Sequence, residues 1–290
     1  MSDRYNKIQV NSMELDKYNR FLIEVTQRCN LQCKYCFYNT MKDRINEDLD
    51  LKDLEKLKNK TFWLTGGEPF LHAQIQDFII EASKFNRVGI FTNGILLNKL
   101  DQSLYNNISR LYISLDSFDS IENNKLRQKS PDIQLLQKLN SLREDLVYLN
   151  ITINQKNYVD FDEFLLQFTE KGFKNLSMNF VSLPISSEIT HTLGLKNKKG
   201  ITKSILNSLF RYKNMINIDR SHMDIRSDYY LENKFNPSEC LANKQQLCFI
   251  DCRGALHKCP NFIMNEKCVN MTKCDSASFD QCIEYLVNCS

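Results

Sequence analysis

The chain has 290 residues, of which 42% are hydrophobic, enough to build a sizeable buried core in one large domain or two modest ones. Its 38 Lys and Arg residues against 35 Asp and Glu give a formal net charge of +3, too small for the basic surface of a dedicated nucleic-acid-binding protein. The N-terminus lacks the apolar run of a signal peptide and no run of about 18 apolar residues occurs, so we expect a cytoplasmic protein without a membrane partner.

Short β-rich runs alternate with amphipathic helical patterns from residue 21 to about 182, after an N-terminal extension over residues 1–20. The predicted strands are Phe21–Thr26, Phe62–Thr65, Arg87–Thr92, Arg110–Leu115, Leu146–Ile153 and Asn175–Val181. The predicted helices between them are Leu51–Lys58, His72–Phe85, Ile133–Arg143 and Phe161–Lys171. This alternation is typical of an α/β fold with a parallel sheet, closed into a full or partial barrel, in which chemistry collects on the loops after the strands.

Two further regions follow the βα array. Residues 183–239 form a less regular bridging region with one helical pattern near Ile201–Tyr212, and residues 240–290 form a cysteine-rich tail.

Three of the 11 cysteines lie on one loop directly after the first predicted strand, at Cys29, Cys33 and Cys36. In a reducing cytosol, thiols are better interpreted as metal ligands or reactive groups than as disulfides. A structural zinc site or a ferredoxin cluster needs four protein ligands, whereas a [4Fe–4S] cluster held by three thiolates leaves one iron open to bind another molecule. The alternative is zinc, with a distant His or Cys as the fourth ligand.

The ends of the next three predicted strands carry small and polar residues. The second ends at Gly66-Gly67-Glu68-Pro69, where paired glycines let the backbone approach a ligand closely and a carboxylate stands beside them. Asn93 follows the third strand, and Ser114 and Asp116 end the fourth. Each would be an ordinary turn or strand end if seen alone. All of them lie at strand C-termini, where we expect the chemistry.

Together these motifs resemble those of the radical S-adenosylmethionine (SAM) superfamily, over roughly residues 20–182. The resemblance implies a partial (β/α)6 barrel, in which the three loop cysteines bind a [4Fe–4S] cluster and SAM chelates its fourth iron. It places the cofactor-contacting positions at Tyr35, Gly66, Gly67, Glu68, Pro69, Asn93, Ser114, Asp116 and Arg127. Arg127 matches the family arginine that meets the SAM carboxylate, and the alternative for it is an exposed helical arginine.

The tail holds the other eight cysteines, at positions 240, 248, 252, 259, 268, 274, 282 and 289. A run centred on Gly254 predicts a hairpin, Phe249–Cys252 returning through Ala255–Lys258. This resembles the start of SPASM and twitch domains, which implies one or two auxiliary [4Fe–4S] clusters, although the later spacings lack the Cys-x2-Cys of a full SPASM domain. The implied ligands are Cys240, Cys259, Cys268, Cys274, Cys282 and Cys289, and the alternative is a zinc module.

Tail thiols that bind no metal have a second expected role. Cys248 and Cys252 are candidates for hydrogen-atom donors to a substrate radical, and the alternative is that each is a small buried hydrophobic residue.

The resemblance implies an enzyme that reductively cleaves SAM to a 5′-deoxyadenosyl radical, which abstracts a substrate hydrogen. We expect it to crosslink or epimerise a ribosomally made peptide, with flavodoxin or ferredoxin as electron donor. One alternative is a dehydrogenase of a small alcohol, aminocyclitol or sugar. Another is a non-enzymatic iron–sulfur or zinc module, which would not need the residues that contact SAM.

Overall fold

The computed structural model describes residues 5–9, 12–36, 38, 46–181, 193, 195–219 and 246–257. The chain divides into two compact units. Among the described residues, unit 1 contains those up to 30, 46–111 and 246–257, and unit 2 contains 31–38, 112–181 and 193–219.

All six predicted strands are present, and each end lies within one residue of its predicted position. They are β2 (Arg20–Thr26), β4 (Thr61–Gly66), β5 (Arg87–Thr92), β6 (Arg110–Ser114), β7 (Val147–Ile153) and β8 (Asn175–Phe180). Short strands join them, namely β1 (Tyr5–Asn6), β3 (Asp48–Leu49), β9 (Asn217–Asp219), β10 (Leu247–Ile250) and β11 (Leu256–His257). The α-helices are α1 (Ser12–Leu15), α2 (Lys52–Glu55), α3 (Ile75–Ser83), α4 (Ser120–Arg127), α5 (Ile133–Leu142), α6 (Phe161–Glu170) and α8 (Lys198–Arg211).

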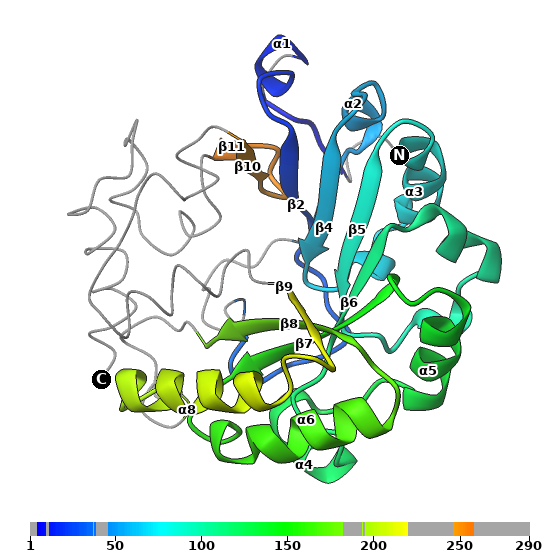
Figure 1. The fold of residues 1–290 in the computed structure, drawn as a ribbon. Helices are drawn as coiled ribbons and strands as arrows, with labels where there is room; N and C mark the ends of the chain where they lie inside the picture. The colour runs from blue at the N-terminus through cyan, green and yellow to red at the C-terminus, as the bar shows by residue number, and fades with distance from the viewer. Residues whose placement is uncertain are drawn as a thin grey trace. The chain divides into compact units, whose positions relative to one another are not determined.

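In unit 1, β2, β4 and β5 are parallel neighbours (Figure 1). Their alternate side chains face α3: the rings of Phe21 and Phe62 lie 5.7 Å apart, and those of Phe62 and Phe78 lie 5.9 Å apart. Five consecutive residues of β4 alternate in burial in the pattern that a strand with one packed face produces. This apolar layer fixes the register of β4 and β5, because a shift by one residue would expose the buried side chains. The positions of the strand ends are fixed with it.

The predicted hairpin of the tail forms and joins the sheet of unit 1. β10 and β11 are antiparallel, with Phe249 opposite His257, and β10 also lies parallel to β2, with Cys248 opposite Phe21. Cys240 and Cys259, two of the implied cluster ligands, lie outside the described residues, as do the four later cysteines. The tail as a separate domain over 240–290 stays a prediction.

In unit 2, β7, β8 and β9 are parallel in that order. Helix α6 buries an i, i+3, i+4, i+7 stripe of Phe161, Phe164, Leu165 and Phe168, the spacing that periodicity predicted. Phe118 stacks on Phe164 with ring centroids 5.2 Å apart. The parallel strands and packed helices confirm the α/β class.

Three helices differ from expectation. Helix α3 covers Ile75–Ser83 and not His72–Phe85, because His72 ends the preceding 3-10 turn Pro69–Leu71. The pattern over Leu51–Lys58 yields only the four residues of α2, and the chain turns at Asn59, whose φ of 59° is the left-handed conformation that Asn tolerates. Helix α4 has no apolar stripe, since only Asn123, Leu126 and Arg127 are buried, and it starts at an Asp119 cap that accepts from two backbone N–H groups. Among the described residues, no helix is long and apolar enough to cross a membrane.

Candidate active site

In unit 1 the paired glycines at the end of β4 lie against the backbone that leads into the cysteine loop. A Cβ on Gly66 would lie 2.1 Å from the Thr26 carbonyl oxygen, and one on Gly67 would lie 2.1 Å from that of Arg28. The Gly67 N–H donates to Thr26 O over 2.7 Å, and the Glu68 N–H donates to Arg28 O over 2.8 Å. The close approach predicted from the glycines is therefore made to the chain itself, immediately before Cys29.

Glu68 ties the ends of β4 and β5 together. Its buried carboxylate accepts from the Thr92 hydroxyl at 2.7 Å and from the Asn93 N–H at 2.8 Å. It also accepts from the Phe70 N–H at 3.2 Å, and so caps the short 3-10 turn that Pro69 begins. Burial raises the pKa of this carboxyl, and the three hydrogen bonds oppose the rise.

Asn93 reaches the first cysteine of the loop. Its side-chain N–H2 donates to Asn30 Oδ1 at 2.7 Å and lies 3.9 Å from Cys29 Sγ, a weak hydrogen bond to sulfur. Its own Oδ1 accepts from the Ile95 N–H at 3.0 Å, which fixes the side chain at the start of the turn. The strand end of β5 and the start of the cysteine loop are thus bonded directly.

A pair that sequence reasoning missed holds the residue before Cys29. Arg28 Nε lies 3.1 Å from Asp48 Oδ1, and its Nη2 lies 2.5 Å from Asp48 Oδ2 and 2.8 Å from the Leu71 carbonyl. The Asp48 side chain is 7% exposed, so this bidentate pair is well shielded on the carboxylate side. The only sequence signal was an arginine adjoining the motif.

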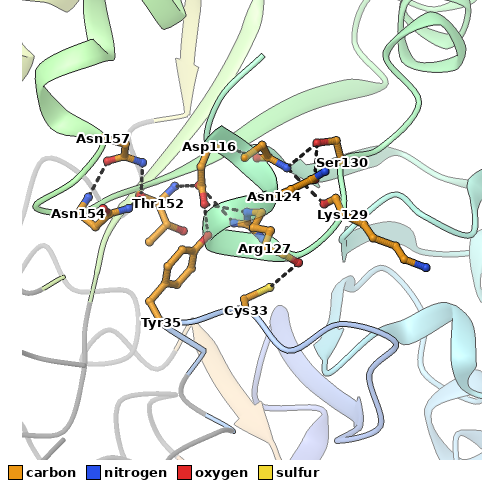
Figure 2. Close-up of polar contacts among 11 residues, drawn as sticks. Cys33, Tyr35, Asp116, Asn124, Arg127, Lys129, Ser130, Thr152, Asn154 and Asn157 are labelled. Atoms are coloured by element: carbon orange, nitrogen blue, oxygen red, sulfur yellow. Dashed lines mark hydrogen bonds and ion pairs between the residues drawn. The ribbon is translucent and has the colours of Figure 1, made fainter. Parts of the chain in front are cut away.

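In unit 2, the Asp116 carboxylate bonds to three other segments of the chain, as Figure 2 shows. Its Oδ2 accepts from the Tyr35 hydroxyl and from Arg127 Nε at 2.8 Å. Its Oδ1 accepts from the Thr152 N–H at 2.9 Å and lies 3.4 Å from Arg127 Nη2. Tyr35 comes from the cysteine loop, Arg127 from the end of α4, and Thr152 from β7, so one carboxylate fixes all three.

Burial sharpens the electrostatics of this network. The Asp116 and Arg127 side chains are 0% and 7% exposed, so the alternative of an exposed helical arginine is wrong. Burial disfavours the charged guanidinium, but Asp116 raises the pKa of Arg127 and keeps it ionised, while burial raises the pKa of Tyr35 and keeps it neutral. The Arg127 guanidinium also lies 5.3 Å from the centroid of the Tyr35 ring.

One guanidinium nitrogen remains open to another anion. The bonds of Arg127 to Asp116 use Nε and Nη2, and Nη1 has no hydrogen-bond partner among the described residues. Ser114, the other predicted contact on β6, is half-buried at the end of that strand. A carboxylate is the kind of group that a free guanidinium N–H binds.

The middle of the cysteine loop is bonded to the end of α4. The Lys34 N–H donates to Leu126 O at 2.8 Å, and Cys33 Sγ lies 3.9 Å from the Arg127 carbonyl. Cys29 belongs to unit 1, whereas Cys33 and Cys36 belong to unit 2. All three thiols are partly exposed, and among the described residues no three His, Cys, Asp or Glu side chains are close enough to hold a metal ion.

The donor set still fits a three-thiolate iron–sulfur site. The three thiols are reduced and partly exposed, and they are soft ligands of the kind that iron–sulfur clusters use.

The tail thiols occupy different positions in unit 1. Cys248 is buried in β10 opposite Phe21, whose ring packs toward Phe62. Cys252 is buried after the strand, where its N–H donates to Glu24 Oε2 at 3.0 Å and its carbonyl accepts from Asn6 at 3.0 Å. Burial raises the pKa of both thiols, which favours the S–H form that a hydrogen donor requires and also suits a buried hydrophobic residue.

The region that carries these motifs matches known proteins. Residues 23–187 match the family model of the radical SAM superfamily. A GTP 3′,8-cyclase of Helicobacter pylori (strain J99) is 28% identical over 244 residues, which cover 77% of this chain and 74% of the relative.

Two solved structures share the fold. Streptococcus suis SuiB bound to S-adenosylmethionine has a TM-score of 0.65 at 19% identity, covering 94% of this chain and 68% of that chain. SuiB has also been solved bound to precursor peptide SuiA. The structure of anSMEcpe with bound AdoMet and Cp18Cys peptide has a TM-score of 0.61 at 18% identity, covering 92% of this chain and 82% of that chain.

Proposed function

Because this chain belongs to the radical SAM superfamily and is therefore an enzyme, we propose that it cleaves SAM reductively at the loop of Cys29, Cys33 and Cys36 and modifies a peptide substrate. Membership of an enzyme family replaces the alternative of a non-enzymatic metal-binding module. The superfamily implies a [4Fe–4S] cluster and SAM, which together supply an electron, break a C–S bond of SAM and give the radical that takes a substrate hydrogen.

One observation carries the proposal: the cysteine loop is held by polar contacts within each unit. In unit 1, backbone bonds from Gly67 and Glu68 hold residues 26–28. In unit 2, the Asp116 network and the end of α4 hold residues 33–35. A loop that merely connected β2 to the next strand would not need Tyr35 bonded to the buried ion pair of Asp116 and Arg127.

The residues around the loop have distinct proposed roles. We assign the SAM carboxylate to Nη1 of Arg127, because that nitrogen is charged, fixed by Asp116 and otherwise without a partner among the described residues. Asn93 is proposed to donate to the Cys29 thiolate, since N–H···S bonds tune the reduction potential of such clusters. Gly66, Gly67, Glu68 and Pro69 are positioning residues in this scheme, and Ser114 remains a proposed SAM contact.

The proposed substrate is a ribosomally made peptide that is crosslinked or epimerised. The two structural neighbours have each been solved with a peptide bound, which makes a peptide the first class to test. The second candidate is a nucleotide, because the curated relative at 28% identity is named a GTP 3′,8-cyclase. A dehydrogenase of a small alcohol or sugar has no specific contact in its favour.

The proposal extends to the tail and the electron source. Auxiliary [4Fe–4S] clusters are proposed on cysteines that lie outside the described residues, and flavodoxin or ferredoxin is the proposed donor. Cys252 is the stronger of the two candidates for hydrogen donation, because Cys248 lies opposite Phe21 on the face that packs toward α3.

The test is anaerobic reconstitution with iron and sulfide, reduction with dithionite, and measurement of 5′-deoxyadenosine and methionine. The wild-type chain should form both, and Cys33→Ala should form neither, because two thiolates are left for the cluster. Iron content and far-UV circular dichroism of the variant separate loss of the cluster from loss of the fold. Unchanged turnover in Cys33→Ala would refute the proposed site.

A further inference from the structure

One face of the unit 2 sheet is polar along its whole length. β7 and β8 alternate strictly, and their residues Val147, Leu149, Ile151, Ile153, Leu176, Met178 and Phe180 form one apolar face. The opposite face, here called the polar face, consists of Tyr112, Ser114, Tyr148, Asn150, Thr152, Asn175, Ser177, Asn179, Asn217 and Asp219. Parallel strands that are packed on both faces are normally continuous apolar runs. A polar face on such a sheet therefore suggests a role in binding a polar ligand.

Side-chain contacts confirm that these residues share a face. Asn179 Nδ2 donates to Asn150 Oδ1 at 3.1 Å, from the neighbouring strand. The Tyr112 hydroxyl donates to Asp219 Oδ2 at 2.6 Å, and the rings of Tyr112 and Tyr148 lie 5.2 Å apart. The polar face therefore runs without a break from β6 to β9.

The polar face meets the Asp116 network near the C-terminal end of β7. Thr152 lies on this face and donates its N–H to Asp116 Oδ1 at 2.9 Å, as Figure 2 shows. Asn150, two residues earlier, accepts the Leu115 N–H on its carbonyl at 3.0 Å. A ligand seated on Asn150 and Asn179 would thus lie beside the group that holds Tyr35 and Arg127.

In the Asn150–Asn179 pair, one side-chain N–H2 group and one side-chain oxygen have no hydrogen-bond partner among the described residues. The bond between them uses Asn179 Nδ2 and Asn150 Oδ1, and among the described residues Asn150 Nδ2 and Asn179 Oδ1 have no hydrogen-bond partner. An N–H and a C=O side by side complement a peptide group, which offers one C=O and one N–H. Strand backbones in sheets use the same pairing.

The uncharged surroundings of Asn150 and Asn179 argue against an anionic ligand at this pair. The side chains beside Asn150 and Asn179 on the two strands are those of Thr152 and Ser177, which are uncharged. Within unit 2 the described part of the face has no Lys or Arg, and Arg110, which alternates with Tyr112 on β6, belongs to unit 1. Recognition of a triphosphate depends on cations, mostly Arg and Lys, with backbone N–H groups. A nucleoside triphosphate seated on Asn150 and Asn179 would meet only amide and hydroxyl groups on β7 and β8.

We propose that the polar face of unit 2 binds the main chain of a peptide, with Asn150 and Asn179 pairing with one of its peptide groups. This rests on the proposed function, because it assigns the substrate class of that same site. Asn150 and Asn179 are then residues that determine specificity for an uncharged, hydrogen-bonding substrate.

The experiment uses the reconstituted full-length chain with unlabelled SAM and dithionite. Two probes are compared in ordinary water: a peptide fraction extracted from the source organism after growth in D2O, and GTP deuterated throughout its ribose. Deuterium in 5′-deoxyadenosine reports which probe lost a carbon-bound hydrogen to the radical. We expect deuterium from the peptide fraction only. Deuterium from GTP, or from neither probe, overturns the proposal.

Variants locate the effect on the polar face. Asn150→Leu and Asn179→Leu should each lower the deuterated fraction of 5′-deoxyadenosine at least tenfold. Each substitution removes one of the two amide groups that would bond the peptide, and it nearly keeps the side-chain volume. The matched control is Asn140→Leu, on α5 in the same unit, whose amide donates only to the Gly172 carbonyl at 3.0 Å. An equal loss in the control, or none in the two test variants, refutes the assignment.

Failure here and failure of the proposed function are distinguishable. Total 5′-deoxyadenosine, deuterated or not, reports SAM cleavage, whereas its deuterated fraction reports only the substrate. A chain that makes 5′-deoxyadenosine but takes deuterium from GTP keeps the proposed cleavage site and loses the peptide assignment.

Discussion

Replacing Asp116 with Asn should destabilise unit 2 strongly, although the two side chains have nearly the same shape. The carboxylate is 0% exposed and neutralises an Arg127 side chain that is 7% exposed. An amide removes that charge, and its N–H2 must face either the donors of Tyr35 and Arg127 or the Thr152 N–H, each of which needs an acceptor. The variant therefore leaves a buried charge uncompensated and at least one donor unpaired.

The magnitude follows from the burial of the pair. Removing one partner of a buried ion pair costs about 3–5 kcal/mol. Since 1 kcal/mol shifts the melting temperature of a domain of this size by about 2–4 °C, the expected fall is on the order of 10 °C. An exposed ion pair is expected to contribute much less to stability. Asp162 and Arg211 form such a pair in the same unit, with both side chains about half exposed.

The assay is thermal unfolding of the apoprotein under anaerobic conditions, followed by far-UV circular dichroism. Asp162→Asn is the matched control and should change the melting temperature little. Adding Arg127→Met to Asp116→Asn should recover part of the loss, because it removes the uncompensated charge. If Asp116→Asn melts no lower than Asp162→Asn, the Asp116 network does not hold the cysteine loop as argued.

Three further predictions test the rest of the site. Gly67→Ala should lower the iron bound by the loop, because its Cβ would lie 2.1 Å from the Arg28 carbonyl oxygen. Gly172→Ala strains a left-handed backbone (φ 80°) but meets no atom within 4 Å, so it should keep its iron, and equal iron contents in the two variants would contradict this. Burial raises the pKa of Glu68 above its usual 4.5, so its contribution to stability is greatest below pH 4.5 and is lost as pH rises toward the raised value. The free energy of unfolding of the wild type minus that of Glu68→Gln, measured in urea from pH 4 to 7, should therefore fall as pH rises. A rise of this quantity with pH would count against a raised pKa. Finally, wild-type protein should hold more than four irons per chain, and a triple Ala variant of the loop cysteines should keep a [4Fe–4S] signal from the tail; zinc in place of that iron would reject the auxiliary cluster.

Local pattern determined the strands and the order of the motifs. Alternation, apolar runs and turn residues placed all six long strands and the hairpin around Gly254, because these features depend on residues that are near one another in the chain. Helix α4 was missed because its polar residues carry no stripe and its one clear signal is the Asp119 cap.

Tertiary structure decided what each motif residue contacts. Arg127 pairs with Asp116, which lies 11 residues earlier, and Asp116 in turn bonds Tyr35, 81 residues away, so burial of the arginine depends on contacts that no local window contains. The paired glycines pack against residues 26–28 because the register of β2 and β4 brings Thr26 beside Gly66. The pairing of Asn150 with Asn179 likewise depends on register. Asn179 lies opposite Thr152, which is two residues from Asn150 and on the same face of β7. Register and long-range burial are set by the packing of whole strands, and a single sequence records only the pattern that permits them.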